Sequence, residues 1–221
     1  MGQRFQSVFI LPKVFMNEGN TNNRSEKVLI FHNQWLYGRG ALNVNLGIME
    51  RIHKAILLRD KCGGFAETKE DFINHFLEKS VLNAVSFVSL QELHNETHFH
   101  KPEELIYSEE EKKPKEEQIT LKELIRRQDN NNGFFICKID ELLNISYAFI
   151  SGFEDEFLIS QKTPKEYLKL FYSDEDLKKT KGLYEHMKTQ IKKFNNFDVI
   201  KDVWLEDTIK YLNENKPSWA N

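Results

Sequence analysis

The chain is organised around Lys27-Val-Leu-Ile-Phe-His-Asn-Gln-Trp-Leu-Tyr-Gly-Arg-Gly-Ala-Leu42. The apolar run 28–31 is followed by polar and aromatic side chains, and two glycines then flank Arg39 before a helical pattern begins. This order predicts a strand, a sharp loop and a helix, with hydrogen-bonding and stacking groups concentrated at the loop. The loop is therefore the first candidate ligand- or partner-binding site. Its candidate residues are His32, Asn33, Gln34, Trp35, Tyr37 and Arg39.

Two interpretations of this loop remain open. In the first, an aromatic side chain stacks on a ligand ring, and Arg39, near a helix N-terminus, binds a phosphate or carboxylate. In the second, Trp35 and Tyr37 fill the core, while Asn33 and Gln34 hydrogen-bond to backbone groups at the strand end. Because no Gly-Lys-Ser/Thr ending accompanies the two glycines, a phosphate-binding loop of the P-loop type is not predicted.

The composition indicates a folded protein without a global preference for nucleic acid. Of 221 residues, 40% are hydrophobic and 29% are charged, which is enough for one sizeable core. The net charge of -3 gives no overall electrostatic case for nucleic-acid binding. Cys62 and Cys137 form no Cys-x-x-Cys pair, and we expect both to be packed hydrophobes in a reducing compartment. Neither a membrane span nor a secretion signal is predicted, because no apolar segment has the required length or cleavage pattern.

The N-terminal part predicts two antiparallel strands. Residues 5–15 are rich in β-branched and aromatic side chains, and Pro12 indicates either an edge strand or a strand bent at that point. A turn-rich loop follows over 17–25, and residues 27–33 return as the second strand.

Two helices are expected next. The first covers 41–59, with Asn45 as a polar exception on its apolar face. The second begins at the capping box Thr68-Lys-Glu-Asp71 and extends to about residue 83, whereas 81–93 is apolar enough that a strand is the alternative. The second helix is expected to bury Phe72, Phe76 and Leu77.

The remaining elements surround a change in composition. Residues 95–118 carry two prolines and a long charged run, and we predict a mobile charged insertion there. A short helix follows over 120–128, and Asp129-Asn-Asn-Asn-Gly133 predicts a turn. Strands are then expected over 134–139, 145–151 and 157–160.

The C-terminal part, 163–221, is predicted to be helical. Thr163-Pro-Lys-Glu166 has the order of a capping box with a first-turn proline. Ser173-Asp-Glu-Asp176 is expected to open a helix that continues to about Lys193, and Asp198 to open a last one. The expected buried side of the last helix is Val199, Val203, Trp204, Thr208 and Tyr211. Together these patterns predict a single α+β domain over 1–221, with a small, mostly antiparallel sheet covered by helices.

No catalytic residue, metal site or cofactor is predicted. His94-x-x-x-His98-x-His100 has metal-ligand residue types, but its loose surroundings favour adventitious binding. The glycine of Asp129-Asn-Asn-Asn-Gly133 stands at the fifth position instead of the sixth, which excludes a calcium loop of the EF-hand type. No nucleophile motif or distinctive carboxylate pair is present. A lysine-rich helix is interpreted as a solvated face, with an acidic partner or nucleic acid as the alternative; its members are Lys178, Lys179, Lys181, Lys188, Lys192 and Lys193.

Three motifs resemble a group of uncharacterised tailed-phage and mobile-element proteins. They are the opening Met1-Gly-Gln-Arg4, the loop Gln34-Trp-Leu-Tyr-Gly38, and Asp129-Asn-Asn-Asn-Gly133 ahead of a strand. The resemblance covers the first third and, more loosely, the central strands, and the composition is similar to that of low-GC gut phages such as the crAss-like group. It implies a phage origin and carries over no catalytic residue.

Two functions follow as expectations. The first is a non-enzymatic phage accessory protein that acts through protein contacts, as a virion component on the capsid or portal vertex. The second is a ligand-binding protein or enzyme in the host cytoplasm that uses the loop on a nucleotide-like anion to counter host defence. The expected partners are capsid or portal proteins, without membrane, and the expected location is the virion or host cytoplasm.

Overall fold

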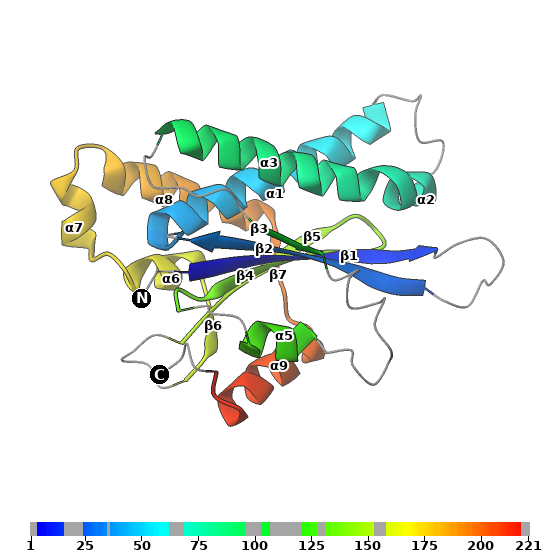
Figure 1. Ribbon diagram of the computed structural model, residues 1–221. Helices are drawn as coiled ribbons and strands as arrows, with labels where there is room; N and C mark the ends of the chain where they lie inside the picture. The colour runs from blue at the N-terminus through cyan, green and yellow to red at the C-terminus, as the bar shows by residue number, and fades with distance from the viewer. Residues whose placement is uncertain are drawn as a thin grey trace.

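The computed structural model describes residues 4–15, 24–34, 36–61, 69–95, 103–106, 121–127, 131–152 and 158–217. Within these residues a sheet forms the middle of three layers, with helices on both of its faces (Figure 1). This arrangement confirms the predicted α+β class.

The sheet is mixed, and most of its neighbouring strands are antiparallel. In the described residues its spatial order is β3-β2-β1-β4-β5-β6, and β7 also pairs with β5. The β1/β4 and β5/β7 pairs are parallel, whereas the other four pairs are antiparallel. The strands are β1 (Arg4–Phe15), β2 (Arg24–Gln34), β3 (Glu103–Ile106), β4 (Phe134–Ile139), β5 (Ile145–Ser151), β6 (Ser160–Lys162) and β7 (Asp198–Val199).

Strand β1 lies between β2 and β4, so it is not an edge strand. Its pairing with β2 shifts register between Leu11 and Val14, and its pairing with β4 ends at Ile10. Pro12 lies within this irregularity, where the missing proline N–H interrupts no regular ladder. The bent-strand alternative is therefore confirmed.

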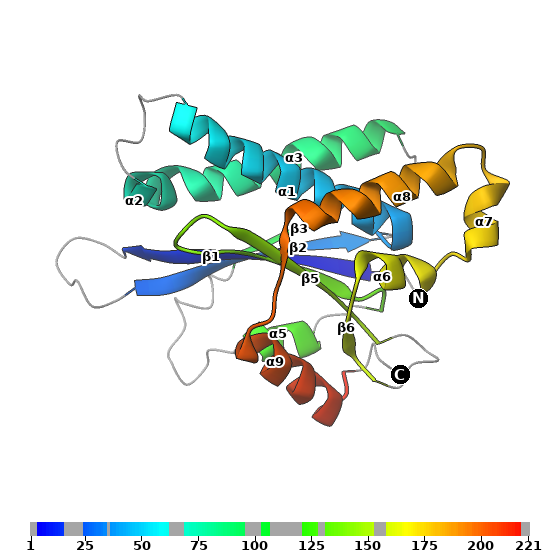
Figure 2. The same ribbon diagram turned by 180° about the vertical axis from the view of Figure 1, so that it is seen from behind.

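The helices form one thick and one thin outer layer (Figure 2). The thick side holds α1 (Gly38–Lys61), α2 (Lys69–Phe72), the π-helix η1 (Ile73–Leu77), α3 (Glu78–Asn95), α6 (Pro164–Lys169), α7 (Asp174–Lys179) and α8 (Leu183–Lys193). The 3-10 turn η3 (Phe194–Asn196) follows α8. On the thin side lie α5 (Leu121–Arg127) and α9 (Val203–Glu214).

Side-chain alternation along the strands divides the interior into two cores. In β5, Tyr147 and Phe149 face the thick layer, whereas Ala148 and Ile150 face the thin one. The thick side is rich in rings, and we call it the aromatic core; its buried rings include Phe5, Phe9, Phe31, Phe72, Phe135, Tyr147, Phe149, Tyr167 and Phe194. The thin side is mainly aliphatic, and we call it the aliphatic core; it includes Val8, Ile10, Val28, Ile30, Ile136, Ile150, Ile159, Leu205 and Leu212.

The polar exception on α1 connects that helix to β1. Asn45 is fully buried, and its Nδ2 donates to the carbonyl of Ala41 at 2.8 Å. Its Oδ1 accepts a hydrogen bond of 2.8 Å from the Ser7 hydroxyl. Both polar side chains are thus satisfied inside an apolar layer, as burial requires.

Several predicted boundaries differ from the structure. The stretch 81–93 belongs to α3 and is not a strand. Within the predicted insertion 95–118, Glu103–Ile106 forms β3 beside β2. The third central strand covers Ser160–Lys162, two to three residues later than predicted.

The C-terminal helices also differ from the prediction. The helix expected over 173–193 is broken, because Thr180 is extended and Gly182 has a φ of 79° ahead of α8. Asp198 belongs to β7, and the last helix begins only after Asp202. Its buried residues are Leu205, Thr208 and Leu212, whereas Val199, Val203 and Trp204 are exposed.

Other predictions agree with the structure or lie outside its described part. The capping box of Thr163 and Glu166 is present, and β4 and β5 have the predicted bounds. Phe72 and Leu77 are buried, and Phe76 packs against them. The features outside the described residues are positions 17–23 of the predicted loop 17–25, Trp35, Cys62, Thr68, His98, His100 and most of 95–118. Arg24 and Ser25, the last two residues of that predicted loop, belong to β2.

Candidate functional site

The first half of the predicted loop lies inside the sheet. His32 and Asn33 belong to β2 and are only 8% and 7% exposed. His32 is aligned with Gln6 of β1 and with Glu103 of β3, so the strand is paired on both sides there. Gln34 ends the strand, and its side chain, like the whole of Trp35, lies outside the described part of the structure.

The second half of the loop reaches the surface. Tyr37 and Arg39 are half-buried, and the Tyr37 ring centroid lies 5.5 Å from that of Phe171, just after α6. Gly38 has a φ of +50°, and a Cβ there would come within 2.6 Å of the Tyr172 ring. A close approach therefore requires glycine at this position. The structure brings Tyr37 to the turn after α6 and places Arg39 in the first turn of α1. A binding role for them stays a prediction.

A buried tyrosine connects this loop to the Asn-rich turn. The Tyr167 hydroxyl donates to the carbonyl of Asn132 at 3.1 Å and accepts a hydrogen bond from the backbone N–H of Gly38. Burial raises the pKa of Tyr167 well above its ordinary value, so the phenol is neutral. Gly133, with a φ of +87°, leaves no room for a Cβ, which would lie 2.4 Å from the Ile150 carbonyl oxygen. The turn before β4 therefore has a packing role.

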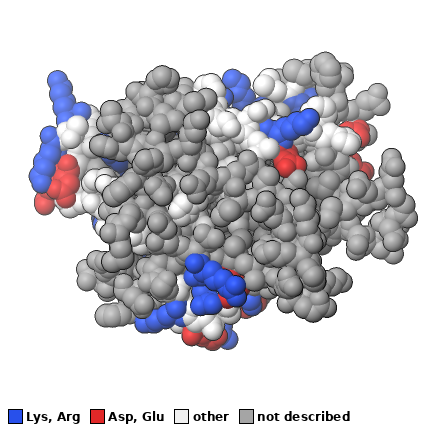
Figure 3. Space-filling model, in the orientation of Figure 1, with Lys and Arg blue, Asp and Glu red and all other residues white. Residues whose placement is uncertain are grey.

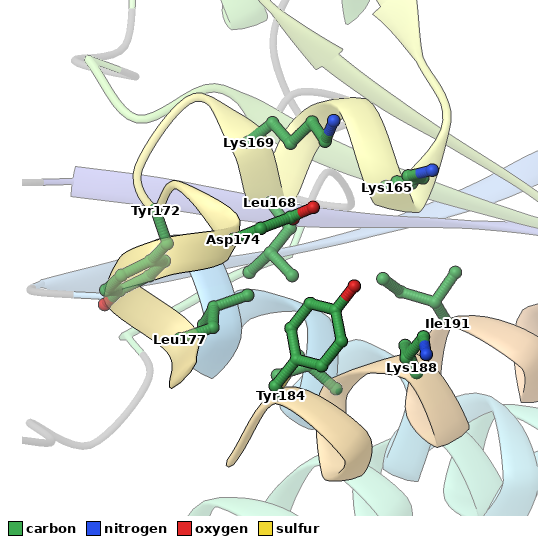
Figure 4. A pocket seen from close by; sticks show the side chains of 10 residues that line it. Lys165, Leu168, Lys169, Tyr172, Asp174, Leu177, Tyr184, Lys188 and Ile191 are labelled. Carbon is green, nitrogen blue, oxygen red and sulfur yellow. The ribbon is translucent and has the colours of Figure 1, made fainter. Parts of the chain in front are cut away.

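The structure also contains a pocket that the sequence did not predict. It lies among α6, α7 and α8, with a volume of about 150 Å³. Its residues are Lys165, Leu168, Lys169, Tyr172, Asp174, Leu177, Tyr184, Met187, Lys188 and Ile191, and we call it the α6–α8 pocket. Figure 4 shows α6 on one side and α8 on the other, with Tyr184 projecting toward the space between them.

The floor of the α6–α8 pocket is apolar and its rim is basic. Leu168, Leu177 and Met187 are buried, at 3%, 3% and 1% exposure. Lys188 lies 3.3 Å from Glu185 and 4.8 Å from the Tyr184 ring centroid. Such a site favours an anionic group attached to an apolar one.

The sequence contains one residue, Gly182, that indicates the helix break beside this pocket. Gly182 lies within the helix predicted over 173–193. The helix breaks there, so α7 and α8 line different sides of the cavity. The lysine-rich pattern contributed only Lys188 to the rim, because Lys165 and Lys169 belong to α6.

Ion pairs neutralise much of the lysine-rich segment. Lys179 pairs with Asp176 at 2.6 Å, and Lys193 pairs with Glu50 at 3.3 Å. The Lys179 hydrogen bond, together with those from Ser173, lowers the pKa of Asp176 to about 2. Figure 3 shows basic and acidic side chains mixed at the α7 end and again over α5 and α9. The described surface thus favours the solvated-face interpretation.

A second charged cluster joins α5 to α9. Glu123 accepts hydrogen bonds of 2.7 Å from Arg126 and 2.6 Å from Arg127, and another from the Tyr211 hydroxyl. The Arg126 hydrogen bonds, then those from Tyr211 and Arg127, hold the pKa of Glu123 well below its usual range. All three partners donate hydrogen bonds to the Glu123 carboxylate. Because Tyr211 belongs to α9 and Glu123 to α5, the cluster stabilises the packing of these two helices.

Large apolar side chains are exposed between β7 and α9. Val199, Val203 and Trp204 are 45%, 70% and 36% exposed, and we call them the β7–α9 patch. The patch is held in place from two sides, because β7 pairs with β5 and Asp202 forms an ion pair with Lys138 of β4. Exposed large apolar side chains grouped within a few residues of the chain are a candidate contact surface.

Other kinds of site find less support in the described residues. No group of three or more His, Cys, Asp and Glu residues is placed there to hold a metal ion. Burial raises the pKa of Cys137, which confirms it as a packed, unreactive thiol. No helix in the described part combines the length and apolar character required to cross a bilayer.

Comparison of the chain with protein-family models, curated proteins and solved structures gives no match. The roles of its residues are therefore argued from their own geometry.

Proposed function

We propose that this protein is a phage accessory protein that acts by binding other proteins, as a virion component on the capsid or portal vertex. The observation that carries the proposal is the β7–α9 patch, where Val203 and Trp204 expose apolar surface at the start of a helix. The resemblance of the N-terminal motifs to phage proteins supports the origin.

The chemistry of the β7–α9 patch supports a protein partner. Tryptophan is enriched at protein interfaces, because its ring buries a large apolar area with few rotatable bonds. The β5/β7 pairing and the Lys138–Asp202 ion pair hold the backbone of the patch against the sheet. A preformed contact surface loses less entropy on association.

Quantitative mass spectrometry of purified particles tests the virion location. We expect the protein at a fixed number of copies for each particle. A Trp204→Asp variant should be lost from particles, because a charge would be desolvated in the contact. Leu58→Asp on α1 is the matched control, since Leu58 is 44% exposed and lies on the opposite side of the sheet. Absence of the wild-type protein from particles would refute the virion location, and equal incorporation of both variants would refute the contact.

A second candidate function uses the loop that ends β2. Tyr37 and Arg39 are both partly exposed, and Arg39 stands in the first turn of α1, where a nucleotide-like anion would be favoured. A thermal-shift series with nucleotides tests this function. Stabilisation that disappears in Arg39→Ala is expected if the loop binds them, and an unchanged melting temperature with every nucleotide would contradict it.

A further inference from the structure

We propose that the α6–α8 pocket binds a small organic anion, namely a carboxylate or phosphate monoester attached to a single ring or a short alkyl chain. This site lies on the thick side of the sheet, away from the β7–α9 patch, and its function is independent of the protein contact proposed above.

The volume of the pocket limits the ligand to one small apolar group. An apolar cavity of about 150 Å³ is large enough for a single benzene ring. The α6–α8 pocket has a volume of about 150 Å³, and its buried Leu168, Leu177 and Met187 offer no hydrogen bonds from their side chains. The part of the ligand that enters must therefore be apolar and about the size of one ring.

The basic rim determines the charge of the ligand. Lys165 and Lys169 lie one helical turn apart on α6, and Lys188 lies on α8 (Figure 4). Within the described residues, no carboxylate is within ion-pairing distance of Lys165 or Lys169. Lys188 is shared with Glu185. Two ammonium groups that form no ion pair with a described carboxylate, beside an apolar cavity, favour a carboxylate or phosphate at its mouth.

One lining residue opposes anion binding and so provides a sensitive test. Asp174 belongs to the pocket lining and carries a negative charge among the three lysines. A bound anion is repelled by this carboxylate, whereas a neutral ligand is not. Removal of the charge should therefore tighten binding of anions alone.

The walls of the pocket are preformed by two capping boxes. Thr163 and Glu166 cap α6, and Ser173 and Asp176 cap α7. The backbone hydrogen bond from Thr163 lowers the pKa of Glu166, so the α6 cap is intact at neutral pH. The ligand meets a site whose helix ends are already fixed.

Isothermal titration calorimetry of the full chain tests the proposal with phenyl phosphate, benzoate and the neutral benzyl alcohol as probes. We expect the two anions to bind about tenfold more tightly than benzyl alcohol. Lys165→Ala/Lys169→Ala should remove most of this preference, and Asp174→Asn should increase the affinity for anions only. Lys192→Ala is the matched control, because Lys192 is exposed on α8 and does not line the pocket.

A methyl signal locates the binding. With ¹³C-methyl-labelled methionine, the Met187 signal, assigned by Met187→Leu, should shift on addition of phenyl phosphate. The signal of Met49, buried in α1, should not shift. Three results would each overturn the proposal. The first is equal affinity for benzyl alcohol and phenyl phosphate, and the second is a loss of anion preference in Lys192→Ala as large as that in Lys165→Ala/Lys169→Ala. The third is a Met187 signal that does not shift at millimolar phenyl phosphate.

Discussion

The two faces of the sheet are built differently and leave different surfaces. On the aromatic face, the Phe149 ring centroid lies 4.8 Å from that of Tyr167, 4.9 Å from Phe135 and 5.6 Å from Phe194. On the aliphatic face, Ile150 and Leu205 pack without such ring contacts in the described residues.

This difference explains where the candidate sites lie. The aromatic face is covered by several helices, and α6, α7 and α8 leave a cavity where they meet. The aliphatic face is closed by α9 through Leu205, Thr208 and Leu212, so residues at the start of that helix stay exposed. A thick layer thus produced a basic pocket, and a thin layer produced an apolar patch.

The largest expected effect on stability comes from truncating one buried side chain in each core, at neighbouring residues of β5. Phe149→Ala should lower the free energy of unfolding by about 5 kcal/mol, and Ile150→Ala by about 3 kcal/mol. The reason is that Phe149 loses ring contacts as well as buried area, whereas Ile150 loses mainly area. Urea denaturation of both variants measures the difference. A greater loss for Ile150→Ala would contradict the contrast between the two cores.

An intermediate effect is expected at alkaline pH, where Tyr147 contributes a buried phenol on the aromatic face. Burial raises the pKa of Tyr147 to about 12 from an ordinary value of 10.0. The unfolded chain therefore loses this proton first, so the stability contribution is complete below pH 10 and is lost as the pH rises toward 12. Between those pH values the free energy of unfolding should fall less steeply in Tyr147→Phe than in wild type. The two slopes should differ by about 1 kcal/mol for each pH unit. Denaturation curves across this range measure both slopes, and identical slopes would contradict the assignment.

The smallest expected effect lies on the thin face. Hydrogen bonds from Arg126, Tyr211 and Arg127 lower the pKa of Glu123, so its contribution is present above its ordinary pKa of 4.5 and is lost as pH falls further. Glu123→Gln should cost about 1 kcal/mol at neutral pH, because the carboxylate is only partly exposed and joins α5 to α9. The difference from wild type should shrink as the pH is lowered through the acid range.

Glu185→Gln is the matched control for this measurement. Glu185 is 73% exposed and pairs only with Lys188 of its own helix among the described residues. We expect no measurable change in its urea midpoint at either pH. A loss equal to that of Glu123→Gln would mean that the α5–α9 cluster has no special role.

Local sequence predicted the elements whose signals lie within a few residues. The bounds of β4 and β5 followed from strand-forming residues after a turn signal, and the cap at Thr163 followed from a four-residue motif. The break between α7 and α8 was missed, because Gly182 is a single glycine within a long run of helix-forming residues. β7 was missed because two residues carry no periodicity, and only pairing with β5 makes them a strand.

The candidate site was harder to predict than the fold. The polar residues after the apolar run were predicted as one loop, yet His32 and Asn33 are buried in a strand, whereas Tyr37 and Arg39 are partly exposed. The strand continues through His32 and Asn33 because β1 pairs with both, and β3 pairs with His32 from the other side. From the sequence alone, a polar residue in a strand that is paired on both sides cannot be distinguished from a polar residue in a loop.

By itself the sequence determined the α+β class and the order of most elements, because these depend on residue types and their spacing along the chain. Only the tertiary structure decided that β1 is central, that Lys165 and Lys169 share a pocket with Lys188, and that Trp204 is exposed. These features depend on which elements come together in space. Such contacts join residues distant in sequence, and no local pattern records them.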